Sequence, residues 1–172
     1  MSDSGVYKNI IAVDDNDNII AAMQMFDAIE KGYNRRASRA YVFNESGKVL
    51  IQRRGKKVFK PFLLDHSMGG HVDEGETYIE AAKRELMEEI GVDAEVWKME
   101  EVTEPFLSID LFSAFYRVTV PDDYEINYDP EEVDEVLWFT PDEIDHLISV
   151  RSKECTLGLI DSWTKLRDKL VT

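Results

Sequence analysis

Three glutamates, Glu85, Glu88 and Glu89, lie within a span of five residues in the middle of the chain. In a helix, residues one, three and four positions apart project from neighbouring turns, so the three carboxylates would occupy one small region. Like charges at these spacings destabilise a helix by roughly a few tenths of a kcal/mol per pair unless a cation lies among them. Carboxylate oxygens are preferred ligands of Mg²⁺, Mn²⁺ and Ca²⁺. The cluster therefore predicts a divalent-metal site, against the alternative of a solvated acidic helix face.

A helix from about Thr77 to Ile90 is predicted to carry these glutamates. Thr77 and Glu80 have the spacing of a capping box, in which each side chain accepts a hydrogen bond from the backbone N–H of the other residue. Gly91 follows the last apolar residue, and glycine ends helices readily because it adopts the left-handed conformation without a steric penalty. Helical periodicity assigns an apolar, core-facing side of the helix to Ile79, Ala82, Leu86 and Ile90.

The glycines before this helix and the residues inside it follow a longer pattern. Five residues separate Gly70 from Glu76, and seven more precede the run Arg84-Glu85-Leu86-Met87-Glu88-Glu89-Ile90-Gly91-Val92. The pattern resembles the Nudix box, the loop–helix–loop signature of a family of hydrolases, and matches it at nine fixed or class-restricted positions over 23 residues. Residues 133–144 are similar to the last strand and following helix of that family. The resemblance therefore covers roughly residues 35–150.

The resemblance implies a metal centre and the residues that form it. In similar proteins, the glutamates at the positions of Glu85, Glu88 and Glu89 bind divalent metal, normally Mg²⁺, with Mn²⁺ as the substitute. The backbone carbonyl at the position of Gly70 often joins them. Glu132, in the acidic run before residue 133, is similar in position to an extra metal ligand or base that some members use, and a solvated loop is the alternative for it.

Arg84 resembles the family arginine that orients the carboxylates by pairing with a glutamate of the box. Glu76 is its expected partner, because a guanidinium can hold a carboxylate through two hydrogen bonds. Bound metal would screen phosphoryl oxygens and lower the pKa of water, and a glutamate would accept the proton. The predicted catalytic residues are Glu89, Glu85 and Arg84. We nominate Glu89 as the general base, and Glu85, Glu132 or another downstream acid remain the alternatives.

Substrate binding needs positive charge, because the chain carries a formal net charge of -15 and an anionic substrate would otherwise be repelled. Arg53 and Arg54 end a predicted strand ahead of the glycines, and His71 follows them. We predict that these three side chains contact substrate. The alternatives are a solvated loop for the arginines and a hydrogen-bonded structural role for the histidine.

The elements around the glutamate helix predict an α/β (α+β) protein with the Nudix fold, in which a mixed central β-sheet is sandwiched between helices. Strands are predicted at residues 9–13, 19–23, 37–43, 49–53, 95–101, 108–120 and 133–139, and further helices begin at Thr140 and cover residues 156–170. We expect one domain over residues 1–172. It would comprise an N-terminal β-hairpin extension (1–34), a Nudix core (35–150) and a C-terminal helix (151–172).

Composition excludes several classes of protein. Hydrophobic residues make up 44% of the 172 residues and charged residues 32%, as in globular proteins. The negative charge argues against binding to a nucleic-acid polymer, and no apolar stretch is long enough for a membrane span. The start, Met1–Gly5, lacks the basic and apolar regions of a signal peptide, so a cytoplasmic location is expected. The predicted partner is a small-molecule diphosphate, with no membrane, and a homodimer is left open.

The predicted function is Mg²⁺-dependent hydrolysis of a diphosphate (pyrophosphate) linkage in a nucleoside diphosphate derivative or similar small molecule. One alternative is isopentenyl diphosphate isomerase, a relative in fold whose N-terminal hairpin this sequence resembles. That family places a catalytic cysteine in a Cys-Gly-His segment, where this chain has Met68-Gly69-Gly70-His71, and Cys155 is its one cysteine. A non-catalytic binding module of the same fold is the other alternative, although such modules have usually lost a metal-binding glutamate.

Overall fold

The computed structural model describes residues 8–171. In chain order its elements are β1 (Ile10–Val13), β2 (Ile19–Met23), α1 (Met25–Glu30), β3 (Asn34–Asn44), β4 (Val49–Arg54), β5 (Leu64–Asp65), β6 (Met68–His71), α2 (Tyr78–Ile90), β7 (Met99–Ser108), β8 (Leu111–Val120), β9 (Val133–Phe139), α3 (Pro141–Arg151), the 3₁₀ helix η1 (Ser152–Glu154) and α4 (Leu157–Leu170). The segment Met1–Gly5, on which the prediction of no signal peptide rests, lies outside the described residues. Between residues 8 and 171, no helix combines the length and apolar character needed to cross a membrane.

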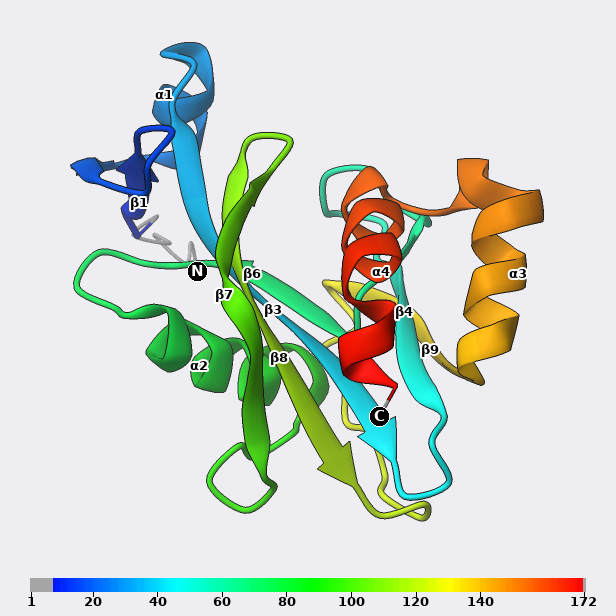
Figure 1. The fold of residues 1–172 in the computed structure, drawn as a ribbon. Coiled ribbons are helices and arrows are strands. Elements are labelled where there is room, and N and C mark those ends of the chain that lie inside the picture. Colours follow the sequence, from blue (N-terminus) through cyan, green and yellow to red (C-terminus); the bar gives the residue numbers. More distant parts are fainter. Residues whose placement is uncertain (1–7, 172) are drawn as a thin grey trace.

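The strands form one branched sheet, and the helices pack around it (Figure 1). Its main path runs β2-β1-β3-β4-β5, while β6 and β8 join at β3, β7 joins at β8 and β9 joins at β4. Along one edge β3 pairs antiparallel with β1, β6 and β4, and along the other edge it pairs parallel with β8. This mixed sheet with its helices confirms the predicted fold class.

Both faces of β3 are covered, because side chains alternate between the two faces of a strand. Tyr41 and Phe43 belong to a core that includes residues of α3 and α4. Ala40 and Val42 belong to a second core, which includes Leu86 of α2. The helix that carries the glutamates is therefore fixed against one face of the sheet, and α4 is fixed against the other.

The predicted ends of α2 are confirmed. Thr77 and Glu80 form the capping box, and Gly91 closes the helix in the left-handed conformation with φ 66°. The predicted apolar face is wrong at Ile79, which is 47% exposed, and Ala81 is buried in its place. The physical reason is the N-terminal hairpin, because Ala81 packs with residues of β1 and turns the buried side of the helix towards that strand.

Two strands in the second half of the chain differ from their predicted bounds. β7 begins at Met99 and not at residue 95, because Val96 and Trp97 donate to the Asp93 carbonyl in a turn. The strand predicted at residues 108–120 is interrupted, since Ile109 has a φ of 63° and turns the chain between β7 and β8. Pro105 is accommodated inside β7 because this strand pairs with β8 alone among the described strands, and an edge position does not require every N–H.

Candidate active site

Glu85 lies directly against Gly70. The Cα atom of Gly70 is so close to the Glu85 side chain that a β-carbon on this glycine would overlap the carboxyl group. Only 15% of the Glu85 side chain is exposed. This burial raises the pKa of the Glu85 carboxyl against the opposing effect of the ion pair with Arg84. The structure therefore brings together two of the predicted metal-site residues, one from β6 and one from α2.

Arg84 connects the carboxylates on both sides of it. Its Nε and Nη2 atoms donate to the two oxygens of Glu76 at 2.6 and 2.8 Å, which is the bidentate pair expected from the sequence. Its Nη1 atom donates to Glu85 at 2.7 Å and to Glu88 at 3.2 Å. These hydrogen bonds lower the pKa of Glu76 and raise that of Arg84. A guanidinium held in this way fixes the direction in which the Glu85 carboxylate points.

Glu89 is the most buried carboxyl group of the cluster, with a relative exposure of 5%. Its oxygens accept hydrogen bonds from the Gln52 amide at 2.7 Å and from the Gly69 N–H at 3.1 Å. Desolvation raises the pKa of Glu89 to about 8, and the charges of Glu85 and Glu132 add to this effect. The sequence pattern did not predict a role for Gln52. The signal was present, because Gln52 shares a face of β4 with the buried Leu50 and a buried polar side chain requires a partner.

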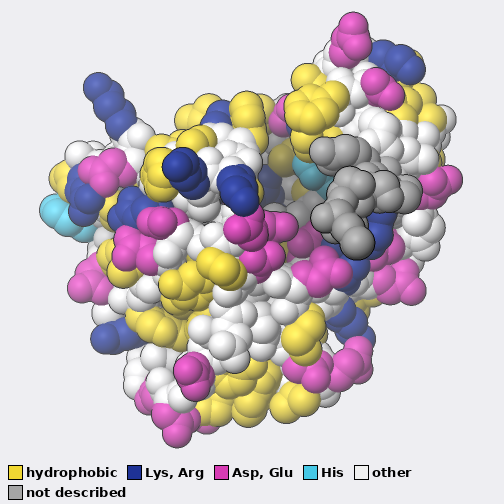
Figure 2. Space-filling view, turned by 180° about the vertical axis from the view of Figure 1, so that it is seen from behind, with side chains coloured by type: hydrophobic (Ala, Val, Ile, Leu, Met, Phe, Trp, Pro, Cys, Tyr) yellow, Lys and Arg dark blue, Asp and Glu magenta, His cyan; other side chains and the backbone are white. Residues whose placement is uncertain are grey.

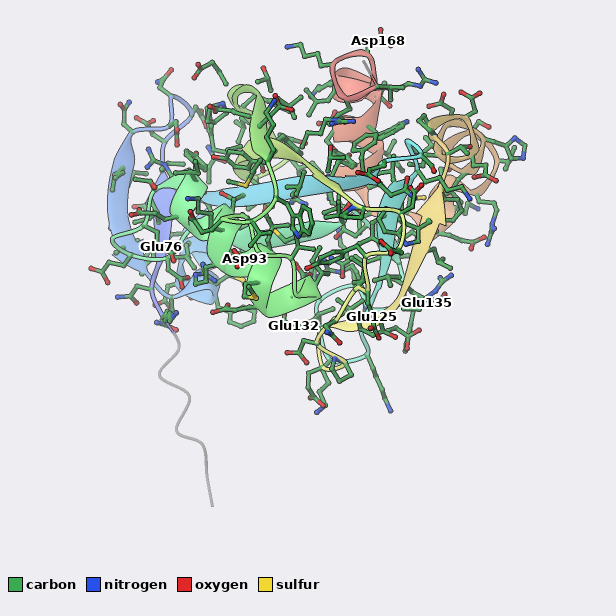
Figure 3. The ribbon with its side chains drawn as sticks, turned by 90° about the horizontal axis from the view of Figure 1, so that it is seen from below. Glu76, Asp93, Glu125, Glu132, Glu135 and Asp168 are labelled. Carbon is green, nitrogen blue, oxygen red and sulfur yellow. The ribbon has the colours of Figure 1, made fainter. Side chains whose placement is uncertain are left out.

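Glu132 reaches the cluster from the loop before β9. The Asp129 N–H donates to the Glu89 carbonyl at 2.9 Å, and the Gly55 N–H donates to the Glu132 carbonyl at 2.7 Å. A β-carbon on Gly55 would lie 2.7 Å from the Glu132 carbonyl carbon, so this close approach requires glycine. Figure 3 shows Glu132 beside the C-terminal end of α2, with Glu76 beside the other end. Desolvation and the neighbouring negative charges of Asp129 and Glu88 raise the pKa of Glu132.

The backbone of β6 presents alternate N–H and C=O groups to opposite edges of the strand. Val72 donates to β3, and Gly70 is paired with Ser38, so the backbone groups of Gly70 face β3. The Gly69 N–H donates to Glu89, so the backbone groups of Gly69 face α2. The carbonyl that can join the carboxylates by this alternation is that of Gly69, while Gly70 supplies the space that Glu85 fills.

The carboxylates form a cluster whose members are held by different partners. Arg84 binds Glu85 and Glu88, whereas Glu89 is bound by Gln52 and the strand backbone. Across residues 8–171, no three acidic, histidine or cysteine side chains already converge as a closed set of metal ligands. The residues nevertheless fit a divalent cation by their chemistry. Several carboxylates whose pKa values are raised by burial and mutual repulsion would all be stabilised by one hard cation.

The predicted substrate-binding arginines are engaged in ion pairs within the chain. Arg53 donates to Glu135 at 2.7 Å, and Arg54 donates to Asp65 at 2.8 Å. A register shift between Arg53 and Arg54 in the pairing of β4 with β9 accompanies this arrangement. Both arginines remain partly exposed, but neither touches Glu85 or its immediate partners.

His71 lies on the opposite face of β6 from the contact between Gly70 and Glu85, because side chains alternate along the strand. Burial lowers the pKa of His71 to about 4, and the positive charges of Arg35 and Arg39 act in the same direction. His71 is therefore neutral near pH 7. The structure thus separates the predicted site residues into a carboxylate group facing α2 and a histidine on the other side of the strand.

The neighbouring His66 has a structural role. Its Nδ1 atom lies 2.6 Å from Asp65, and its Nε2 atom lies 2.7 Å from the Ser162 hydroxyl, which also contacts the Tyr41 hydroxyl at 2.7 Å. The order of acid, histidine and serine is that of a hydrolytic triad, but His66 and Ser162 have no exposed surface. A nucleophile without solvent access cannot meet substrate, so this network joins β5 and β3 to α4.

A shallow surface depression of about 360 Å³ lies away from these groups. Its lining consists of Phe139 and five residues of α3: Asp142, Glu143, His146, Leu147 and Arg151. It shares no residue with the carboxylate cluster. The carboxylate cluster, where the charges and buried donors converge, is therefore the candidate active site in preference to this depression.

The raised pKa of Glu89 predicts how stability depends on pH in the presence of a metal chelator. The ordinary pKa of this glutamate is 4.5, and its pKa in the folded protein is about 8. At a pH between these two values, the folded protein keeps a proton on Glu89 that the unfolded chain has released. The free energy of unfolding therefore falls as pH rises through this window. Glu89→Gln should remove this decline and leave the variant more stable than the wild type at pH 8, by on the order of 1 to 3 kcal/mol. Urea unfolding at pH 5 and pH 8 measures the difference. An identical pH dependence in both proteins would contradict the assignment.

The chain is similar in sequence and in fold to known proteins. The family model of the NUDIX domain matches residues 33–156. An uncharacterised Nudix hydrolase from Nostoc sp. is 34% identical over 138 residues, which are 77% of this chain and 80% of that protein. An isopentenyl-diphosphate Delta-isomerase from Haloarcula marismortui is 30% identical over 142 residues, covering 76% of this chain and 75% of its own. A crystal structure from Deinococcus radiodurans superposes with a TM-score of 0.81 at 22% identity, covering 92% of this chain and 99% of the other.

Proposed function

Because the chain belongs to the Nudix hydrolase family, we propose that it cleaves the diphosphate linkage of a nucleoside diphosphate derivative or similar small molecule, with Mg²⁺ or Mn²⁺ as the cofactor. The observation that carries this proposal is the contact between Glu85 and Gly70 beside the buried Glu89. Paired carboxylates on a helix that faces a glycine strand can hold a hard cation next to backbone oxygen.

We propose Glu85 and Glu89 as the principal metal ligands, with Glu88 and Glu132 as further ligands. The backbone ligand is a carbonyl of the glycine pair, and the direction of the backbone groups in β6 favours Gly69 over Gly70. A divalent cation at this position neutralises charge on phosphoryl oxygens and makes water more acidic. The chain itself supplies the positions of the carboxylates through Arg84 and Gln52, which hold Glu85 and Glu89.

Glu89 is our proposed general base. A base functions best when its pKa lies near the working pH, and burial raises the pKa of Glu89 towards neutrality. The Gln52 amide and the Gly69 N–H orient its two oxygens. Glu85 and Glu132 remain the alternative bases, because the pKa of each is also raised by burial and neighbouring negative charge.

The isomerase alternative depends on a thiol that the site does not contain. Gly69 stands where the isomerase segment has its cysteine, and Cys155 lies after η1 with 4% relative exposure. Its Sγ atom is 3.9 Å from the Arg151 carbonyl, in the core beneath α3 and α4. The proposed chemistry therefore has no use for sulfur, and the retained glutamates likewise argue against a non-catalytic module.

Cys155→Ser should leave hydrolysis within about twofold of wild type while lowering stability. A buried hydroxyl that replaces a thiol costs about 1 to 3 kcal/mol when it lacks a good partner. Thermal unfolding measures the loss of stability, and kcat at saturating Mg²⁺ measures activity below the unfolding temperature. Loss of turnover in the folded variant would count against the hydrolase assignment.

Phosphate release from a panel of nucleoside diphosphate derivatives, with and without Mg²⁺, tests the proposal as a whole. Isopentenyl diphosphate serves as the isomerase control. We expect metal-dependent cleavage of at least one nucleoside diphosphate derivative and no isomerisation. Conversion of isopentenyl diphosphate without release of phosphate would replace the hydrolase proposal with the isomerase alternative.

A further inference from the structure

The face of β3 opposite to α2 carries positively charged side chains next to small ones, and we call it the cationic face. Arg35, Ala37 and Arg39 lie on this face, because side chains two positions apart in a strand point to the same side. In the sheet register, Ala37 lies between Ser113 of β8 and His71 of β6. Side chains in register share a face, so the two arginines and the histidine surround a position where only Ala37 and Ser113 fill the sheet surface.

Two nitrogen atoms on this face lack hydrogen-bond partners. Among the described residues, the buried side-chain nitrogen and oxygen atoms without a partner are Arg35 Nε and His71 Nε2. A buried polar atom left unpaired costs roughly as much as the desolvation of that group, so such atoms are rare without a reason. They occur here together, on neighbouring strands and on the same side of the sheet. Arg35 Nε is a donor, so the group that would satisfy it is a hydrogen-bond acceptor.

The guanidinium group of Arg39 also has N–H donors whose contacts with acceptors are long or shared. Its Nε atom is 3.4 Å from the Ser113 hydroxyl, and its Nη1 atom is 4.0 Å from Asp65. Nη1 also lies 3.0 Å from His66 Nδ1, but that nitrogen is 2.6 Å from Asp65. If the His66 hydrogen is donated to Asp65, the same nitrogen cannot accept one from Arg39. Arg54 shares Asp65 as well, so Arg39 has no carboxylate of its own.

The cationic face adjoins the carboxylate cluster across a single strand. Arg39 Nη1 lies 3.4 Å from the position that a β-carbon on Gly69 would occupy. The N–H of the same glycine donates to Glu89. Three guanidinium groups on this side, those of Arg35, Arg39 and Arg54, share the two carboxylates of Asp110 and Asp65. The excess charge is therefore positive here, in a chain whose net charge is -15.

We infer that Arg35, Arg39 and His71 form a subsite for an oxyanion of the substrate, such as a phosphate group beyond the linkage that is cleaved. The inference rests on the proposed function of the carboxylate cluster and adds a substrate class to it. Guanidinium groups recognise phosphate oxygens through fixed pairs of donors. His71 is of intermediate exposure, and Figure 2 shows that acidic side chains are otherwise spread over much of the rear face of the molecule. Substrates with an additional terminal phosphate should therefore be preferred.

The test compares two arginines of one strand. Arg39→Gln removes a charge from the proposed subsite, whereas Arg36→Gln removes the same charge from the opposite face, where Arg36 binds Asp17. For each Mg²⁺-loaded enzyme, kcat/KM is measured on a nucleoside triphosphate and on the β-methyl ester of the nucleoside diphosphate, which carries a methyl group where the triphosphate carries its terminal phosphate. Arg39→Gln should lower the ratio of these values by about 10- to 100-fold, and Arg36→Gln should keep it within about twofold of wild type.

A binding measurement without metal accompanies the kinetics. In EDTA and at constant ionic strength, inorganic phosphate should raise the melting temperature of the wild type and of Arg36→Gln, and this shift should be lost in Arg39→Gln. If Arg39→Gln fails to fold, the same substrate preference is measured in His71→Gln and His71→Leu. Glutamine can replace the Nε2 hydrogen bond and should retain more of the substrate preference than leucine does.

The outcomes separate this inference from the proposed function. Equal ratios in Arg39→Gln and Arg36→Gln would overturn the subsite, and an inactive Glu85→Gln enzyme would at the same time uphold the metal site. Loss of phosphate protection with an unchanged ratio would show that the face binds free phosphate only, which also overturns it. Full activity of Glu85→Gln would instead remove the proposed function on which the subsite rests.

Discussion

Glu85→Gln and Glu89→Gln are each expected to reduce metal-dependent turnover by roughly 10³-fold or more, because electrostatic stabilisation by a bound cation depends on these carboxylates. Both substitutions preserve side-chain size. Folding should survive, since each removes a negative charge that its neighbours repel. The measurement is the rate of phosphate release at saturating Mg²⁺, together with circular dichroism to establish that each variant is folded.

Glu80→Gln is the matched control for these two variants. It makes the same chemical change on the same helix, but Glu80 belongs to the exposed capping box at the opposite end from Glu89. Glutamine is also accepted in a capping box, so the helix start is retained. We expect its activity to remain within about threefold of wild type. A fully active Glu85→Gln or Glu89→Gln enzyme would refute the assignment of the metal site.

Gly70→Ala is expected to reduce kcat/KM by roughly 10²-fold or more, because its β-carbon would occupy the space that the Glu85 carboxyl fills. Either the side chain or the strand must move, and a displacement of about 1 Å at a reacting centre has an effect of this size. Overpacking at a buried contact also lowers stability by about 1 to 3 kcal/mol. Urea unfolding measures the change in stability, and steady-state kinetics measure the change in activity.

Gly69→Ala provides the comparison on the same strand. A β-carbon on Gly69 would meet Arg39 Nη1 at 3.4 Å, which the flexible end of that side chain can accommodate. We expect kcat/KM of Gly69→Ala to be at least about tenfold higher than that of Gly70→Ala. If the two alanine variants were equally impaired, the close contact between Gly70 and Glu85 would not be what positions the carboxylate.

The sequence predicted α2 well because its signals are local. The capping box of Thr77 and Glu80 and the left-handed Gly91 act within one turn of the helix, so neighbouring residues alone determine where it begins and ends. The pairing of Arg84 with Glu76 was also predictable, because the resemblance to the Nudix box named the residue type and its partner. The predicted glutamate cluster follows from helical spacing once the helix is fixed.

Other features of the structure depend on contacts between residues far apart in the sequence, which the spacing of residue types does not reveal. The short strands β5 and β6 went unpredicted because two to four residues with glycines carry little strand signal, and only the pairing of β6 with β3 makes it a strand. The short helix α1 was likewise not predicted. The ion pairs of Arg53 and Arg54 could not be foreseen, since Glu135 and Asp65 come close only through the pairing of β4 with its neighbours.

The parallel pairing of β3 with β8 has a consequence for how the chain folds. Arg35 pairs with Leu111, which follows it by 76 positions, so a large loop must close before these contacts can stabilise anything. β6 and α2 come earlier in the chain and can dock on β3 sooner. The other edge of β3 stays unpaired until β8, which ends at Val120, has been synthesised. An open strand edge can pair with a second chain. β3 is thus also a strand that the nascent chain must protect from aggregation.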